Sequence, residues 1–301
     1  MTLAPRQLVL LILLTLSWGI NWPVMKIGVT EYPPLAFRAL SIWLGLPFVY
    51  VAARKMGHSL RIERGGWGEV TRLAITNMTV WHVLAIVSIQ ALSSGRAAIL
   101  GYTMPIFSAL WGRWLFGERM SARQVLGVVA AGVGVLLLLW HEFGRMAGQP
   151  WGAIGMLVAA AVWALGTQQL RRTTLQVSTI TLAWWMLVLS AVVLTALTAG
   201  FERDRWHAPS PAAWAAIVFN AAVIFGFAQI AWMVLARTLP PAASTLSVMM
   251  IPVLGAVSGA LWLGETLHWQ DAAAVVLMGA AIASVLWPAR TPAGEREAQR
   301  R

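Results

Sequence analysis

The chain has 301 residues, of which 59% are hydrophobic and only 11% are charged, and its mean hydropathy is +0.71. Soluble domains have about 25% charged residues, so this composition excludes a soluble globular fold and predicts a protein embedded in a bilayer. The net charge of +11 comes from basic residues that lie between apolar stretches, which favours a membrane-topology signal over a nucleic-acid partner. There is no cysteine, which excludes disulfides and thiolate metal sites.

In chain order, ten apolar stretches approach the length of about 20 residues that a membrane-spanning helix needs. We predict helices, because backbone polar groups in lipid must be hydrogen-bonded within their own segment. The fold class expected is therefore all-α and integral to the membrane. The predicted spans are 7–28, 33–53, 68–89, 93–116, 122–140, 152–170, 179–200, 212–235, 240–263 and 270–287.

The predicted fourth and fifth spans share their sequence plan with the ninth and tenth, at a constant offset of 147 residues. The matched positions are Pro105 and Pro252, Gly112 and Gly259, Gly117–Glu118 and Gly264–Glu265, Gly132 and Gly279, and Trp140 and Trp287. Landmarks that keep one offset through two segments indicate a duplication. We therefore divide the chain into two five-helix repeats, 1–145 and 146–289, followed by a disordered cytoplasmic tail, 290–301.

This pattern resembles the EamA repeat of the drug/metabolite transporter superfamily. In that family a proline-bearing span, a Gly-Glu ending and a Gly-rich last span recur in both halves. The resemblance covers residues 7–288, approximately, and implies an exporter of small metabolites, with neutral or aromatic amino acids as the leading substrates. Asn21 resembles the polar position after Trp-Gly in the family's first span, and Arg38 a basic residue often carried in the second.

The distribution of Lys and Arg predicts the orientation of the chain. Most of these residues fall on the side of both termini, which the positive-inside rule places in the cytoplasm of a bacterial inner membrane. Because five is odd, the second repeat must enter the membrane inverted, with Glu118 at the cytoplasmic end of its span and Glu265 at the outer end. Inverted repeats are typical of secondary transporters, which bind substrate near the midplane and work by alternating access.

All eleven acidic residues lie in loops or at the ends of predicted spans. Proton-coupled antiporters use a titratable group inside the membrane, most often a carboxylate. The sequence therefore favours facilitated efflux over carboxylate-based proton antiport. It also has no nucleophile motif, phosphate loop or His/Asp metal cluster, so we expect neither an enzyme nor a bound metal or cofactor.

Polar and aromatic residues deep in the spans are the candidates for contact with substrate. They are Trp18, Asn21, His82, Tyr102, Trp163, Asn220 and Gln229, with Pro105 and Pro252 as candidate hinges. An intramembrane histidine usually faces a cavity or a polar partner. Each candidate has a structural alternative, since amides and histidines also link helices and tryptophans also pack. Arg38 lies close to the outer edge, so we expect it to snorkel towards water.

Three alternative functions remain open at this point. A multidrug exporter for apolar cations would use the same architecture, a lipid scramblase or flippase would present a groove to the bilayer, and a membrane enzyme lacks a visible catalytic constellation. The partners expected are a small-molecule substrate and the lipid bilayer, without nucleic acid, and the chain is compatible with a monomer or a homodimer.

Overall fold

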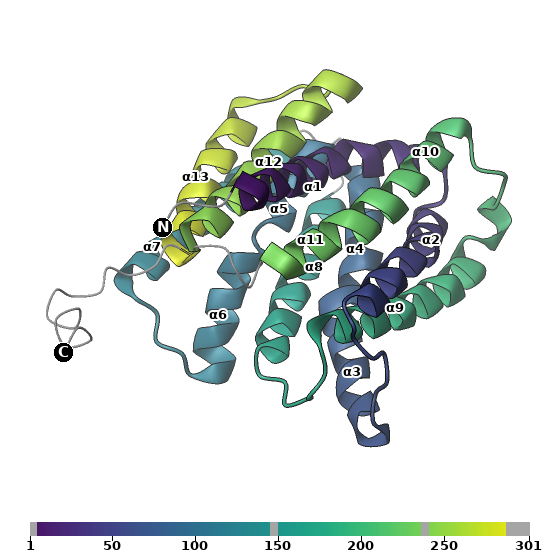
Figure 1. Ribbon diagram of the computed structural model, residues 1–301. Helices are drawn as coiled ribbons and strands as arrows, with labels where there is room; N and C mark the ends of the chain where they lie inside the picture. The colour runs from purple at the N-terminus through teal and green to yellow at the C-terminus, as the bar shows by residue number, and fades with distance from the viewer. Residues whose placement is uncertain (1–4, 145–149, 236–240, 287–301) are drawn as a thin grey trace, which may run out of the picture.

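The computed structural model describes residues 5–144, 150–235 and 241–286, and in these residues every regular element is a helix. The helices pack into one bundle (Figure 1). Six helical segments are long and apolar enough to cross a membrane: Pro5–Glu31, Pro34–Lys55, Arg64–Ala91, Pro150–Leu170, Thr179–Phe201 and Pro211–Trp232. Three shorter apolar helices are Ala122–Leu138, Met249–Leu263 and Trp269–Ser284. The all-α prediction is confirmed; the predicted tail, 290–301, lies outside the described residues.

Helices α1 (Pro5–Glu31) and α2 (Pro34–Lys55) are joined by a tight turn. Pro34 suits the first position of a helix, where a backbone N–H has no partner within the helix. The next two N–H groups of α2, at Leu35 and Ala36, donate to the Glu202 carboxylate at 3.1 and 2.9 Å. Glu202 follows α9 (Thr179–Phe201), so this carboxylate joins the end of α9 to the start of α2.

Two of the long helices contain a π-helical stretch. The first runs through α3 (Trp67–Ala74), Ile75–Thr79 and α4 (Val80–Ala91), and the second through α10 (Pro211–Phe219), Asn220–Ala228 and α11 (Gln229–Leu235). The two π segments begin at positions 145 residues apart in the chain. A π segment changes the direction in which the side chains around it point, and such segments are frequent at functional sites.

The predicted span 93–116 is broken into α5 (Ser94–Gly101) and α6 (Met104–Phe116). Pro105 has no N–H to bond to the carbonyl four residues before it, so the helix cannot continue through this point without loss. Helix α12 (Pro241–Leu263), in contrast, runs through Pro252 without interruption. The two candidate hinges thus differ: a helix break accompanies Pro105 and does not accompany Pro252.

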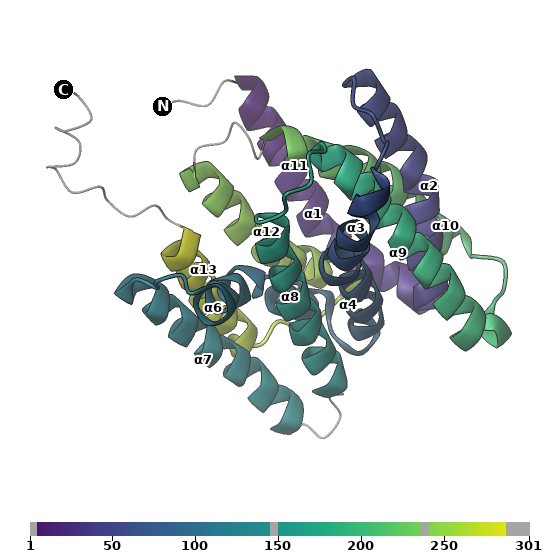
Figure 2. The same ribbon diagram turned by 90° about the horizontal axis from the view of Figure 1, so that it is seen from below.

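The bundle has two edges that are clear in both views (Figures 1 and 2). At one edge α7 (Ala122–Gly144) lies along α13 (Trp269–Leu286), and Arg123 Nε donates to the Ser284 carbonyl at 3.1 Å. At the other edge α2 packs on α9. Between them, α1 packs against α12, and α8 (Pro150–Leu170) packs against α4 and α6.

Helices α6 and α12 end in the same way, at Gly117 and Gly264. These glycines have φ values of +68° and +65°, the left-handed conformation of a helix C-cap that other residues rarely adopt. The next backbone N–H, of Glu118 or Glu265, donates back to the carbonyl of Gly112 at 2.9 Å or of Gly259 at 3.4 Å. The two matched sequence motifs therefore form matched local structures.

The two glutamates of these motifs lie at opposite ends of the bundle. Glu265 accepts hydrogen bonds from Ser94, at the start of α5, whereas Glu118 directly follows the end of α6. Because α5 and α6 cross the bundle in succession, these contacts place Glu265 at one end, called here the Glu265 end, and Glu118 at the other.

Candidate functional site

Arg38 lies at the centre of a buried polar cluster. Its side chain is enclosed by the bundle, and the residue is only 4% exposed. Arg38 Nη1 donates to Asn220 Oδ1 at 3.2 Å, and Nη2 contacts Met25 Sδ at 2.6 Å. The prediction that Arg38 snorkels to water is wrong, because α1 and the π segment of the α10–α11 helix cover this face of α2.

Two aromatic contacts join His82 to the same cluster. Phe225 lies with its ring centroid 5.6 Å from that of His82 and 5.9 Å from Arg38 Cζ. Asn21 precedes Met25 by one turn of α1, so the two residues share a helix face. We call Asn21, Met25, Arg38, His82, Asn220 and Phe225 the Arg38 cluster.

Three polar atoms of the Arg38 cluster have no hydrogen-bond partner among the described residues. They are Asn21 Oδ1, Arg38 Nε and His82 Nε2. A buried polar group without a partner costs about 1–3 kcal/mol. Three such atoms lie in this one cluster, which makes it a candidate site for a polar ligand.

The cluster lies well inside the bundle. Asn220 follows the nine residues of α10. At about 1.5 Å per residue, this places Asn220 about 13 Å along the helix from its start. This distance corresponds to a position between the end and the middle of a membrane-spanning helix.

Three aromatic side chains form a second group, one each from α1, α4 and the turn between α5 and α6. The rings of Trp22 and Tyr102 lie 6.4 Å apart in an edge-to-face arrangement. Trp22 and Trp81 both lie against Gly101, where a Cβ would approach their ring atoms to 2.8 and 3.2 Å. We call Trp22, Trp81 and Tyr102 the aromatic group; it is packed in the hydrophobic core, with Trp22 only 4% exposed.

The other sequence candidates lie elsewhere. Trp18 packs against Trp232 of α11, with ring centroids 5.6 Å apart. The Trp163 backbone carbonyl accepts a hydrogen bond from Asn77 at 3.3 Å, so this contact joins the π segment 75–79 to α8. Gln229 is half-buried at the start of α11.

The structure thus links Asn220 directly, and His82 through Phe225, to Arg38. Asn21 lies one turn from Met25 on α1, and Tyr102 lies beside Trp22. Trp22 was not among the sequence candidates and lies beside Tyr102. Arg38 is buried, and no pattern in the sequence indicates this burial.

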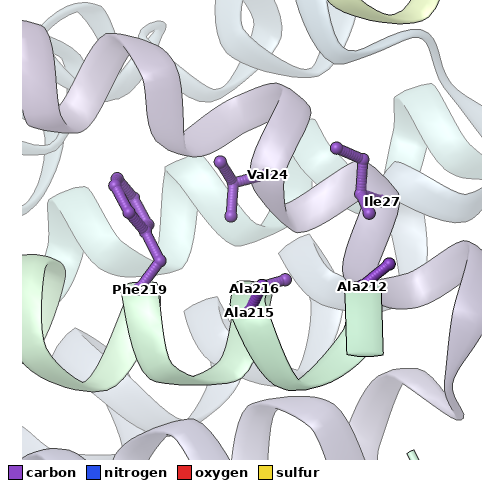
Figure 3. Close-up of a pocket in the computed structure, with 6 residues that line it drawn as sticks. All are labelled: Val24, Ile27, Ala212, Ala215, Ala216 and Phe219. Atoms are coloured by element: carbon purple, nitrogen blue, oxygen red, sulfur yellow. The ribbon is translucent and has the colours of Figure 1, made fainter. Parts of the chain in front are cut away.

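A separate crevice of about 330 Å³ opens between α1 and α10 (Figure 3). Its lining is formed by Val24, Ile27, Ala212, Ala215, Ala216 and Phe219. These side chains have no hydrogen-bonding groups, so the crevice cannot orient a polar ligand. The Arg38 cluster is therefore the better candidate for recognition of a polar solute.

Polar contacts tie the helices together at the Glu265 end. Lys26 Nζ donates to the carbonyls of Ile89, Gln90 and Leu92 at 2.8–2.9 Å, at the end of α4. Arg96 and Asp271 form a buried ion pair with an Nε–Oδ1 distance of 2.7 Å between α5 and α13.

At the opposite end the contacts join α6 to α8. Glu118 pairs with Arg172, and Gln168 Nε2 donates to the Ser108 carbonyl at 2.7 Å. Each end of the bundle is thus held by its own set of polar contacts.

Comparison with known proteins identifies the family. The model of the EamA-like transporter family matches residues 6–140 and, a second time, residues 150–287. The chain belongs to the EamA-like transporter family. It is therefore a multi-pass membrane transporter, and the two matches coincide with the duplication visible in the sequence.

Relatives of this EamA-like transporter are also transporters by name. It is 30% identical over 261 residues to the uncharacterized inner membrane transporter YedA of Escherichia coli (strain K12), which covers 84% of this chain and 82% of that protein. It is 25% identical over 261 residues to a probable terminal-alkyne amino-acid exporter of Streptantibioticus cattleyicolor, covering 85% and 84%. A crystal structure that is 20% identical superposes with a TM-score of 0.68 over 95% of this chain and 99% of that one, which shows a shared fold.

Proposed function

We propose that this transporter exports small metabolites, above all neutral or aromatic amino acids, across the bacterial inner membrane. It works by alternating access between two inverted five-helix halves, residues 1–145 and 146–289, with both termini in the cytoplasm. The observation that carries this proposal is the position of the matched Glu118 and Glu265 motifs at opposite ends of one bundle.

Several paired features support an inverted repeat. The motifs that close α6 and α12 are alike in conformation and opposite in position, and two π segments begin 145 residues apart. The packing partners also correspond: α1 lies on α12 as α8 lies on α6. Two similar halves of opposite orientation give similar gates at both ends, which is what alternating access requires.

The site chemistry and a relative support an amino acid as substrate. The Arg38 cluster offers a cation, amides and an imidazole, while the aromatic group offers stacking surface for an apolar side chain. One relative is a probable amino-acid exporter by name. The buried charge of Arg38 opposes apolar cations, which disfavours the multidrug alternative.

Facilitated efflux is the transport mode that the acidic residues favour. Glu202, Glu265 and Asp271 each bind helix starts or a basic partner at one end of the bundle. Glu118 pairs with Arg172 at the other end. Each of these carboxylates is already engaged by backbone N–H groups or by a basic partner, so none is placed to carry protons beside the substrate.

Efflux from proteoliposomes tests the proposal. Vesicles containing the purified protein are loaded with radiolabelled phenylalanine, and efflux is followed with and without a pH gradient. We expect efflux at a similar rate in both conditions, competed by other neutral and aromatic amino acids.

A His82→Ala variant provides the control for proton coupling. If efflux depends strictly on the gradient and the variant abolishes that dependence, the uniport mode is wrong. If neither protein moves any amino acid in either condition, while cationic dyes are exported, the proposed substrate class is wrong.

A further inference from the structure

Arg38 is a buried cation whose contacts are all neutral. Its guanidinium meets the Asn220 amide oxygen, the Met25 thioether, and the rings of Phe37 and Phe225, with Cζ 5.8 and 5.9 Å from the two ring centroids. Within residues 5–144, 150–235 and 241–286 no carboxylate contacts it. A buried charge without a counterion is strongly unfavourable, so an anion is the missing partner.

The carboxylate that caps the start of α2 is already engaged. Glu202 accepts two backbone hydrogen bonds from the first turn of α2 and a third from the Thr198 hydroxyl at 3.0 Å. It therefore serves as a helix cap one turn away from Arg38 and is not available as its counterion.

Two residues of the cluster, Arg38 and His82, have no polar equivalent in the second half of the chain. Arg38 is four residues into α2; the residue four into α9 is Ala183. His82 is seven residues after the start of its π segment; the residue seven after the start of the second is Phe227. Polar residues that are needed only to build the repeated fold would occur in both halves. We therefore infer that Arg38 and His82 have a role beyond folding.

The geometry of the guanidinium indicates which anion fits. Nε and Nη2 form one edge of the group, with two parallel N–H bonds that match the two oxygens of a carboxylate. Along this edge Nε has no partner, and Nη2 meets only the sulfur of Met25, a weak acceptor. Nη1 is held by Asn220, which fixes the direction of the open edge.

We propose that the Arg38 cluster binds the carboxylate of the transported solute. This rests on the proposed function and names its recognition element. The flexible Met25 side chain moves aside, and the two carboxylate oxygens accept hydrogen bonds from Nε and Nη2 of Arg38. Asn21 Oδ1, one turn away on the same face of α1, then accepts a hydrogen bond from the α-amino group. The cluster therefore selects solutes with a free carboxylate.

Binding measurements with altered solutes and altered protein test this assignment. The probes are phenylalanine, phenylalaninamide, which lacks the carboxylate, and 3-phenylpropionate, which lacks the amino group. Affinities are measured by titration of the detergent-purified full chain, for the wild type, Arg38→Gln and Arg38→Lys. Arg72→Gln, which removes a surface arginine, is the control for a general effect of charge.

We expect the wild type to bind phenylalanine about 30-fold or more tightly than the amide, as for other truncated charge pairs. Arg38→Gln should weaken the binding of phenylalanine and of 3-phenylpropionate by a similar factor. The affinity for the amide should stay within about threefold of the wild-type value. Arg38→Lys should restore part of the loss, because it keeps the charge but not the two-pronged geometry. Arg72→Gln should match the wild type.

Equal wild-type affinity for phenylalanine and its amide would overturn the assignment. An equal loss of affinity for phenylalanine and for its amide in Arg38→Gln would also overturn the assignment, because an arginine with a purely structural role would affect both solutes alike. Arg38-dependent binding of 3-phenylpropionate without transport of any amino acid would keep the carboxylate site and reject the proposed function. The two proposals therefore fail separately.

Discussion

Glu265 accepts hydrogen bonds from the backbone N–H of Ser94 at 2.7 Å and from the Ser94 hydroxyl at 2.8 Å, across 171 residues of sequence. These two hydrogen bonds join the end of α12 to the start of α5. Its counterpart in the repeat, Glu118, is bound instead to Arg172 at the end of α8. The two equivalent carboxylates therefore have different partners in this structure.

The first prediction concerns the sides of the membrane. The natural chain has no cysteine, so a single introduced thiol reports its own position without background. We expect Arg119→Cys and Leu267→Cys, both at exposed positions after the matched glutamates, to react with a membrane-impermeant maleimide from opposite sides. Labelling is compared in intact cells and inverted vesicles. Reaction of both thiols from the same side would rule out the inverted repeat.

The second prediction separates two tryptophans of α1. Trp22 contacts Tyr102, whereas Trp18 packs on Trp232 away from the aromatic group. We expect Trp22→Leu to reduce transport of phenylalanine several-fold more than transport of alanine, because stacking surface for aromatic side chains is lost. Trp18→Leu, the matched control, should affect both solutes equally. The reverse pattern would show that the substrate's aromatic ring meets Trp18.

The third prediction tests the close packing behind Glu265. A Cβ at Gly259 would collide with the Glu265 carboxylate and the Ser94 hydroxyl. We expect Gly259→Ala to displace the carboxylate and to lower the melting temperature of the purified protein. At Gly132 of α7 a Cβ would meet nothing within 4 Å, so Gly132→Ala should stabilise the helix by about 0.5–1 kcal/mol. A Gly259→Ala variant as stable as the wild type would mean that the Glu265 contact is dispensable.

The fourth prediction compares a buried ion pair with an exposed one. The Arg96–Asp271 side chains are 11% and 7% exposed, whereas Arg72 of the Arg72–Glu69 pair is 53% exposed. Removing one member of a buried pair costs about 3–5 kcal/mol, and an exposed pair contributes about 0–1 kcal/mol. Chemical unfolding should therefore show a large loss for Asp271→Asn and almost none for Arg72→Gln. Similar values would mean that water reaches Asp271.

The sequence alone indicated that the protein lies in a lipid bilayer, that its fold is all-α and that it contains two copies of one unit. Few charges among long apolar stretches exclude a water-exposed surface, and glycine and proline at constant offsets indicate two copies of one unit. The closing motifs at Gly117 and Gly264 could be predicted because they depend on local backbone conformation. The break at Pro105 could not be predicted in this way, because the matched Pro252 lies inside an unbroken helix.

Only the tertiary structure decided which side chains meet. Arg38 is close to a helix end in sequence and became the core of a polar cluster because other helices cover it. Trp22 lies beside Tyr102 whereas Trp18 packs on Trp232, although the two tryptophans are about one turn apart on one helix. The burial of a side chain and the direction in which it points depend on neighbours that are distant in the chain. The π segments also rotate the side chains that follow them, so local sequence patterns cannot determine either property.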